Sequence, residues 1–106
     1  MEFIETKVFT KRALEFFEDG HYGLFQAGLV ANPEAGDVIP GSGGIRKIRW
    51  GLDSRGKRGG LRILYQWIPE KSQVFLLFVF GKNEQSDLTP AQLAVLRKLM
   101  EDEKNG

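Results

Sequence analysis

The stretch L-R-I-L-Y-Q-W-I-P-E-K-S-Q-V-F-L-L-F-V-F, residues 61–80, decides the fold because it encodes two neighbouring strands. Leu61–Ile68 is apolar and aromatic, and it ends at Pro69, which cannot donate to a ladder of strand hydrogen bonds. Val74–Phe80 is an unbroken apolar run, which is typical of a central strand covered on both faces. The polar residues 70–72 form the turn between them. The stretch therefore predicts two strands at the centre of a sheet.

A third strand, Gly44–Trp50, is expected just before this pair. Because side chains alternate along a strand, one face is largely apolar and the other largely cationic. The first face holds Arg46, Ile48 and Trp50, and the second holds Ile45, Lys47 and Arg49. Gly51–Gly60 then forms a loose hairpin whose tip carries Arg55, Lys57 and Arg58.

The N-terminal third predicts one strand and two helices. Phe3–Phe9 has strand composition, and Thr10 is placed to cap a short helix that ends near Gly20. A second helix fits His21–Ala31, and residues 33–44 are expected to form a loop. The apolar positions expected to pack from the second helix are Leu24, Phe25, Leu29 and Val30.

The last helix has the clearest boundary signals. Thr89 is a good N-cap, Pro90 follows at the first helical position, and Gln92 completes a capping box. Leu88 and Leu93 are spaced as a hydrophobic staple. Leu93, Leu96 and Met100 form an apolar stripe at helical spacing. The order β-α-α-β-β-β-α predicts an α+β domain with an antiparallel sheet.

Composition limits the classes of function. The 106 residues, 42% of them hydrophobic, fit one domain spanning residues 1–106. We expect a cytoplasmic protein, because no apolar run reaches the roughly 18–20 residues of a membrane span and the N-terminus lacks the pattern of a signal peptide. There is no cysteine, and His21 is the single histidine. Neither a cysteine nor a multi-histidine metal site is therefore possible, and nothing calls for a cofactor.

Charge is concentrated in one segment. Gly41–Arg62 holds seven of the fifteen Lys and Arg residues and one acid, Asp53, so its net charge is 7 − 1 = +6. The rest of the chain has 8 basic and 13 acidic residues, or −5. A glycine-rich basic segment in a nearly neutral chain indicates a surface that binds a polyanion.

Three blocks of sequence carry a resemblance to a known family. They are G-D-V-I-P-G-S-G-G-I-R-K-I-R-W, then G-K-R-G-G-L-R-I-L-Y, then F-V-F-G-K-N-E-Q-S-D-L-T, within Gly36–Leu99. Their order and spacing resemble the RelE/ParE superfamily of bacterial toxins, and most of all its HigB-type branch. The resemblance implies a compact toxin fold and a metal-independent endonuclease that cuts mRNA on the ribosome. It also implies neutralisation by a cognate antitoxin, a DNA-binding protein of the HigA type.

Cutting RNA without a metal requires proton removal from the 2′-hydroxyl, charge stabilisation on the phosphorane and support for the 5′-oxygen leaving group. Arginine and lysine suit these tasks, because Arg grips phosphate through two hydrogen bonds and Lys is a mobile charge that crowding can tune. By resemblance, Arg62 in L-R-I-L-Y is the phosphate clamp. Lys47 and Arg49 match the family's basic pair and are candidates for proton transfer and charge stabilisation.

The chain departs from the family pattern after the third strand. Asn83 stands where ribosome-dependent members carry an arginine, and S-D-L-T stands where some carry a tyrosine, which leaves the general acid unassigned. Lys82 either replaces the missing cation or pairs with Glu84 or Asp87. The residues expected to contact RNA or the ribosome are Arg46, Arg55, Lys57, Arg58 and Asn83.

Two other functions stay open at this point. The same superfamily includes noncatalytic toxins of the ParE kind, which inhibit DNA gyrase through protein contacts. A nucleic-acid-binding domain without catalysis is the other alternative. Retention of Lys47, Arg49 and Arg62 favours the nuclease. His21 is expected to be structural, and core packing is the expected role of Trp50, Tyr65 and Trp67, with base stacking as an alternative for Trp50.

Overall fold

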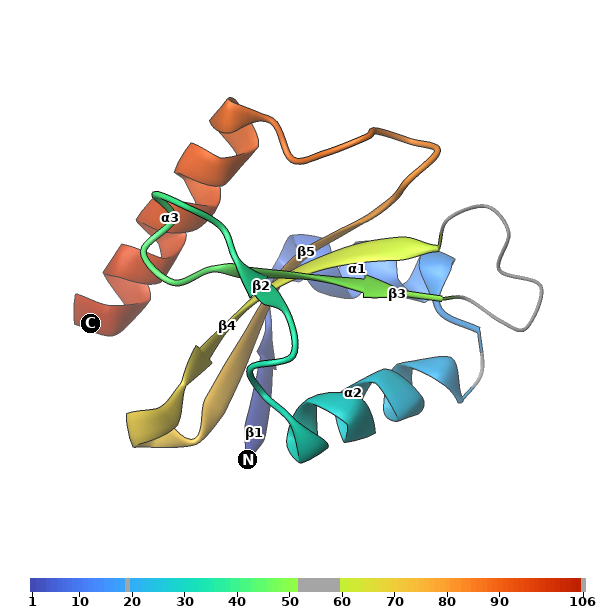
Figure 1. Cartoon of the computed structure of the whole chain (residues 1–106), viewed down its shortest axis with the longest axis horizontal. Helices are drawn as coiled ribbons and strands as arrows, with labels where there is room; N and C mark the ends of the chain where they lie inside the picture. Colours follow the sequence, from blue (N-terminus) through green and yellow to red (C-terminus); the bar gives the residue numbers. More distant parts are fainter. Residues whose placement is uncertain (19, 52–59, 106) are drawn as a thin grey trace.

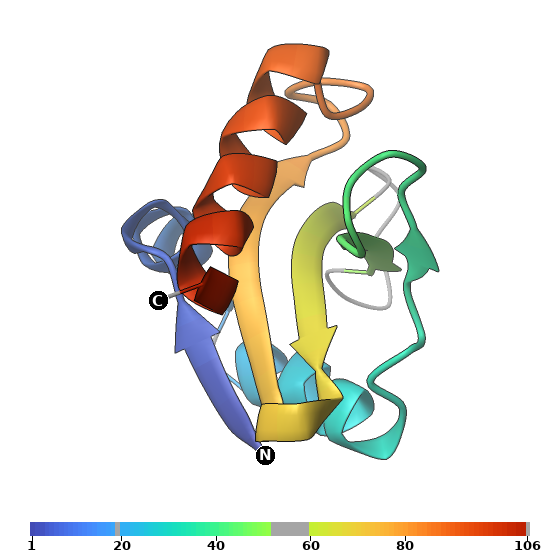
Figure 2. The ribbon, with the colours of Figure 1, turned by 90° about the vertical axis from the view of Figure 1, so that its left-hand side faces the viewer.

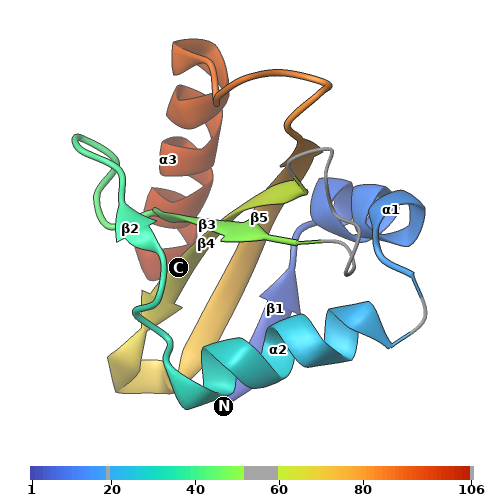
Figure 3. The same cartoon turned by 45° about the vertical axis from the view of Figure 1, so that its right-hand side comes forward.

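A computed structural model describes residues 1–18, 20–51 and 60–105. In this part of the chain a five-stranded sheet has helices on both faces (Figures 1 and 3). The strands are β1 (Glu2–Glu5), β2 (Asp37–Val38), β3 (Arg46–Trp50), β4 (Leu61–Ile68) and β5 (Gln73–Gly81). The helices are α1 (Lys7–Phe16), α2 (His21–Ala31) and α3 (Pro90–Asn105), with a short 3₁₀ helix, η1 (Pro69–Lys71). The predicted α+β class and the order of its main elements are confirmed.

The sheet order is β1-β5-β4-β3-β2, which puts β4 and β5 at the centre as predicted. Two features differ from the expectation. The sheet is mixed rather than antiparallel, because β1 pairs parallel to β5 with Glu2 opposite Gln73. In addition, the predicted loop of residues 33–44 contains β2, which pairs antiparallel with β3 through Asp37 and Lys47. Figure 2 shows β1 and β5 side by side.

The expectation that Thr10 caps the first helix is wrong, because the cap is Thr6. Its Oγ1 accepts a hydrogen bond from the Phe9 amide at 3.0 Å and donates one to Leu77 O at 2.8 Å. The strand thus ends where its pairing with β5 ends, at Glu5. Thr10 lies one turn further along, and its hydroxyl donates to the Glu5 carboxylate.

Two apolar clusters lie on opposite faces of the sheet. Phe9 and Ala13 of α1 and Phe25 and Leu29 of α2 pack on one face, whereas Leu96 and Met100 of α3 pack on the other. β5 is buried between them, as its unbroken apolar run predicts. Its side chains alternate between the two clusters, and one bulge interrupts the alternation. Leu64 pairs with Phe78 and Tyr65 with Leu76, so Leu77 is the extra residue.

The helix predictions hold in part. In α2, Phe25 and Leu29 are buried, but Leu24 and Val30 are 62% and 55% exposed, so only half of the expected apolar positions pack. The capping box of α3 is confirmed: the Gln92 amide donates to Thr89 Oγ1 at 3.1 Å, and the Thr89 amide donates to Gln92 Oε1 at 2.9 Å. Across the described ranges, no helix combines the length and apolarity needed to cross a bilayer.

Candidate functional site

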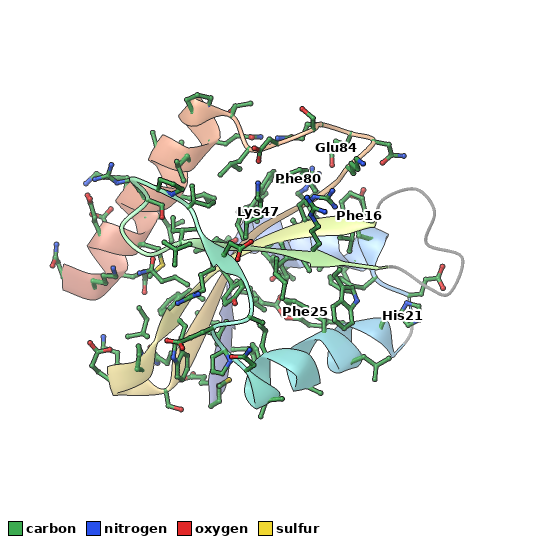
Figure 4. All side chains as sticks on the ribbon, in the orientation of Figure 1. Phe16, His21, Phe25, Lys47, Phe80 and Glu84 are labelled. Carbon is green, nitrogen blue, oxygen red and sulfur yellow. The ribbon has the colours of Figure 1, made fainter. Side chains whose placement is uncertain are left out.

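The cationic face of β3 looks toward the side of the sheet that carries α3. Ile48 and Trp50 pack into the cluster on the α1 and α2 side, so the alternating residues Lys47 and Arg49 point the other way, as the sequence predicts. In Figure 4, Lys47 lies on the same side of the strands as Phe80, and Phe25 lies on the opposite side. On this side the apolar cluster includes Ile45, just before β3, and Leu64, opposite Lys47, and the two cations of β3 lie at its edge.

Arg62 joins this face from β4. It pairs directly with Arg49 across the β3–β4 ladder and with Phe80 across the β4–β5 ladder, so the three side chains form one row. Arg49 is exposed, whereas Arg62 is only 7% exposed. The resemblance assigns residues 47, 49 and 62 to the reacting centre. The structure brings these three residues together on neighbouring strands.

The pairing of two arginines across adjacent strands has an energetic meaning. Side chains directly opposite one another in an antiparallel ladder have Cβ atoms about 4.5–5.5 Å apart, and like charges at such positions destabilise a sheet. A row of cations on one face becomes favourable when an anion binds over it. Guanidinium and ammonium groups are the side-chain groups that recognise phosphate in proteins, so this face has the chemistry that binding of a polyanion requires.

Asp87 belongs to the same site, although it follows β5 by several residues. Its Oδ1 accepts hydrogen bonds from Lys47 Nζ at 3.0 Å and from the Leu88 amide at 2.7 Å. The hydrogen bond from Lys47, the Leu88 amide and the charges of Lys47 and Arg62 together hold the pKa of Asp87 below its usual range. Asp87 was expected only as a possible partner of Lys82, and strand alternation gave no signal for its place here.

The segment that holds Asp87, residues 82–89, arches from β5 to α3 (Figure 1, orange). Its start is a turn in which the Glu84 and Gln85 amides donate to Gly81 O. Its end is tied to the helix, since Gln85 Nε2 donates to Asp87 O and to Gln92 Oε1, each at 2.8 Å. The backbone on both sides of Asp87 is therefore fixed by hydrogen bonds.

Two open grooves flank Lys47. The first, of about 460 Å³, runs between β2 and the start of α3 and is lined by Asp37, Ile39, Lys47, Asp87, Thr89 and Leu93 among others. The second, of about 410 Å³, lies along β3 and is lined by Ala35, Gly36, Asp37, Lys47, Ile48 and Arg49. Lys47 is the cation common to both, so a chain lying along them would pass over its ammonium group.

Arg46 lies on the other face of β3 and makes a different set of contacts. Its guanidinium donates to Gly36 O at 2.7 Å and to Glu34 O at 3.2 Å, and it lies 3.9 Å from the Glu34 carboxylate. The side chain thus holds the segment that leads into β2. The structure does not bring Arg46 together with Lys47, Arg49 and Arg62.

The remaining predicted site residues lie at the margin of the cluster or beyond the described residues. Lys82 and Asn83 are exposed just after β5, and Glu84 pairs with Arg12 while Asp87 pairs with Lys47, so neither carboxylate is paired with Lys82. Arg55, Lys57 and Arg58 lie outside the described residues.

The aromatic and histidine candidates lie away from the cations. Trp50 packs edge-on against Phe25 with ring centroids 5.4 Å apart, and Tyr65 and Trp67 also contact the cluster on that face, as expected for core residues. His21 begins α2, far from Lys47 in Figure 4. Among the described residues, no group of acids and histidine is arranged to hold a metal ion.

No family model matches the chain. Its fold is nevertheless found in solved structures of the toxin RelE. The free E. coli toxin RelE, in a double arginine-to-alanine mutant, superposes with a TM-score of 0.57 at 19% identity, covering 80% of this chain and 86% of RelE. The intact E. coli RelBE toxin–antitoxin complex gives a TM-score of 0.57 at 21% identity, covering 76% of this chain and 94% of the matched chain. The protein has a RelE-like fold.

Proposed function

We propose that the protein is the toxin of a toxin–antitoxin module and that it cuts mRNA on the ribosome. The observation that carries this proposal is the convergence of Lys47, Arg49 and Arg62 on one face of a RelE-like sheet. The residues that the resemblance to the superfamily singles out are thus the three cations that share this face of the sheet. Within the superfamily, the sequence pattern favours the HigB-type branch.

Each part of the proposed reaction is assigned to one or more of these side chains. The 2′-hydroxyl loses its proton and its oxygen bonds to phosphorus, and the bond from phosphorus to the 5′-oxygen breaks as that oxygen takes up a proton. Arg62 holds the phosphate and the charge that develops on it, while Lys47 and Arg49 serve proton transfer and charge stabilisation. We assign support of the leaving group to Lys82, and no metal or organic cofactor takes part.

Binding partners follow from the same surface. The groove along β3, whose lining has the cations Lys47 and Arg49 and one acid, suits an RNA backbone. Asn83 and the cations of residues 55–58 are proposed contacts to RNA or the ribosome. One structural neighbour is a toxin–antitoxin complex, which supports an antitoxin as the partner of this chain. We propose a DNA-binding antitoxin of the HigA type, and the cytoplasm as the place of action.

The test is induced expression followed by mapping of mRNA 5′ ends in cells that carry the wild type, Arg62→Ala or Arg97→Ala. Arg97 is the matched control, an exposed arginine on α3 that pairs with Glu101. We expect wild-type and Arg97→Ala cells to stop growing and to show cuts in reading-frame register within translated regions. Loss of a preorganised charge-stabilising group lowers the rate by about 10²–10³-fold, so Arg62→Ala should show neither effect.

Two outcomes would contradict the proposal. Full toxicity of a folded Arg62→Ala protein would remove Arg62 from the chemistry. Growth arrest by the wild type without cuts in translated regions would instead point to a noncatalytic toxin of the gyrase-inhibiting kind. Circular dichroism of each purified variant shows whether its fold is intact.

A further inference from the structure

One carboxylate oxygen lies where the cations of the site converge. Asp87 Oδ1 accepts from Lys47 Nζ at 3.0 Å and from the Leu88 amide at 2.7 Å, and the charge of Arg62 acts on the same carboxylate. The two donors come from β3 and from the segment before α3, whereas Arg62 on β4 acts through its charge alone. Two separate parts of the chain therefore donate to one negatively charged oxygen.

Such a set of donors is also what a phosphate oxygen requires. A nonbridging phosphate oxygen is bound by cationic side chains and by backbone N–H groups, and it carries charge similar to that of a carboxylate oxygen. Asp87 lines the larger groove beside Lys47, so an RNA phosphate that enters this groove meets a site already holding a negative charge. The carboxylate of Asp87 and the phosphate compete for Lys47.

The ion pair between Asp87 and Lys47 is weak and easily exchanged. The Asp87 side chain is 63% exposed and the Lys47 side chain 33% exposed, and ion pairs this exposed contribute little to stability because water screens them. The backbone around Asp87 is fixed by the Gln85 hydrogen bonds, so the exchange needs a rotation of one side chain and no movement of the segment. Displacing the Asp87 carboxylate from Lys47 therefore costs little free energy.

We infer that Asp87 is an intramolecular competitor that occupies the phosphate position beside Lys47 and must swing away before RNA binds. The inference rests on the proposed function for the identity of the natural anion. Asp87 lowers the affinity for any anion at this position by the same factor, so a single phosphate binds weakly, whereas an RNA held along both grooves at several phosphates still displaces the carboxylate.

The alternative is that Asp87 orients Lys47 and so assists anion binding. The two roles predict opposite effects of removing the charge. Asp87→Asn is nearly isosteric, and its amide oxygen still accepts from the Leu88 amide, so the segment keeps its shape while the competing charge is lost. Asp102→Asn is the matched control, because Asp102 is as exposed as Asp87 and accepts from Lys98 Nζ at 3.1 Å, but lies on α3 and lines neither groove.

The experiment titrates each purified protein with inorganic phosphate and with a short RNA whose sugars are all 2′-O-methylated, which blocks cleavage. Dissociation constants are read from amide chemical shifts of β3. We expect Asp87→Asn to bind both probes about fivefold more tightly than the wild type, and Asp102→Asn to change affinity less than about twofold. Unfolding midpoints show that each variant is folded.

Every other result overturns the inference. Weaker binding by Asp87→Asn assigns an orienting role to Asp87, and unchanged binding assigns it neither role. An equal gain for Asp102→Asn reduces the effect to net charge, and the absence of phosphate binding in the wild type and Asp87→Asn removes the anion site. These outcomes are independent of the nuclease test. A protein that cuts no mRNA but gains phosphate affinity on Asp87→Asn refutes the proposed function and leaves the competitor in place.

Discussion

Replacing Tyr65 by Phe removes one hydroxyl that ties the segment before β2 to the sheet. The phenol oxygen accepts from the Gly36 amide and donates to Pro33 O, each at 2.9 Å, and Tyr65 is fully buried. A Cβ on residue 36 would lie 2.9 Å from the Tyr65 ring, so the segment and the ring are in close contact. Phe keeps the ring and its packing, and the substitution therefore tests the two hydrogen bonds alone.

The expected loss follows from the unpaired groups. The Gly36 amide is buried, and leaving a buried donor unsatisfied costs about 1–3 kcal/mol. For a domain of this size each kcal/mol lowers the melting temperature by about 4–8 °C. We expect Tyr65→Phe to lose about 1–3 kcal/mol in the free energy of unfolding, measured by urea denaturation followed by circular dichroism at neutral pH.

Two further measurements sharpen this test. Burial raises the pKa of Tyr65, so its contribution is present below the ordinary tyrosine pKa of about 10 and falls as pH rises further. The stability difference between wild type and Tyr65→Phe should therefore shrink above about pH 10. Arg46→Gln removes the other anchor of the segment, and the double mutant should show coupling of about 0.5 kcal/mol or more. A Tyr65→Phe protein within about 0.5 kcal/mol of the wild type would refute the reasoning.

Two substitutions test other parts of the structure. Gly60 has φ +64°, and a Cβ there would lie 2.3 Å from Trp50 O, so Gly60→Ala should lose at least about 2 kcal/mol of unfolding free energy. Gly23→Ala, in α2 with no atom near its Cβ, should instead gain up to about 1 kcal/mol, and a similar loss in both proteins would contradict the steric argument. Hydrogen bonding from Arg12 lowers the pKa of Glu84, so this contribution is present above the ordinary glutamate pKa of about 4.3 and is lost as pH falls through the lower folded value. Glu84→Gln should flatten the fall of the urea midpoint below about pH 4, whereas the exposed control Glu70→Gln should follow the wild type.

Local signals predicted the elements that depend on local chemistry. The capping box at Thr89 and Gln92 is a short-range pattern, and the structure reproduces it. The error at the first helix is also informative. Thr6 and Thr10 are equally good caps by residue type, and the choice falls on Thr6 because the pairing of β1 with β5 ends at Glu5. That pairing is set by residues far along the chain, which no local window contains.

The candidate site likewise contains some residues that local patterns predict and others that depend on distant parts of the chain. Alternation along one strand places Lys47 and Arg49 on a common face, and this much is readable from sequence. The place of Arg62 opposite Arg49 depends on the register of two strands, and that of Asp87 on the path of the segment after β5. No local pattern pointed to Asp87 as a site residue, because its neighbours Leu88 and Thr89 fit the start of a helix.

The parallel pairing of the first strand with the last sets the order in which the protein can assemble during its own synthesis. Glu2 meets Gln73, so the N-terminal strand has no partner until residues 73–76 have been made. Before that, Arg49 and Arg62 stand on β3 and β4, which have only the two-residue strand β2 beside them, and a sheet this small is at best marginally stable in water. β5 joins the two halves, and residues 82–89 complete the basic site only after it. The cluster of Lys47, Arg49, Arg62 and Asp87 is therefore incomplete on a nascent chain until residue 87 has been made and has folded against β3.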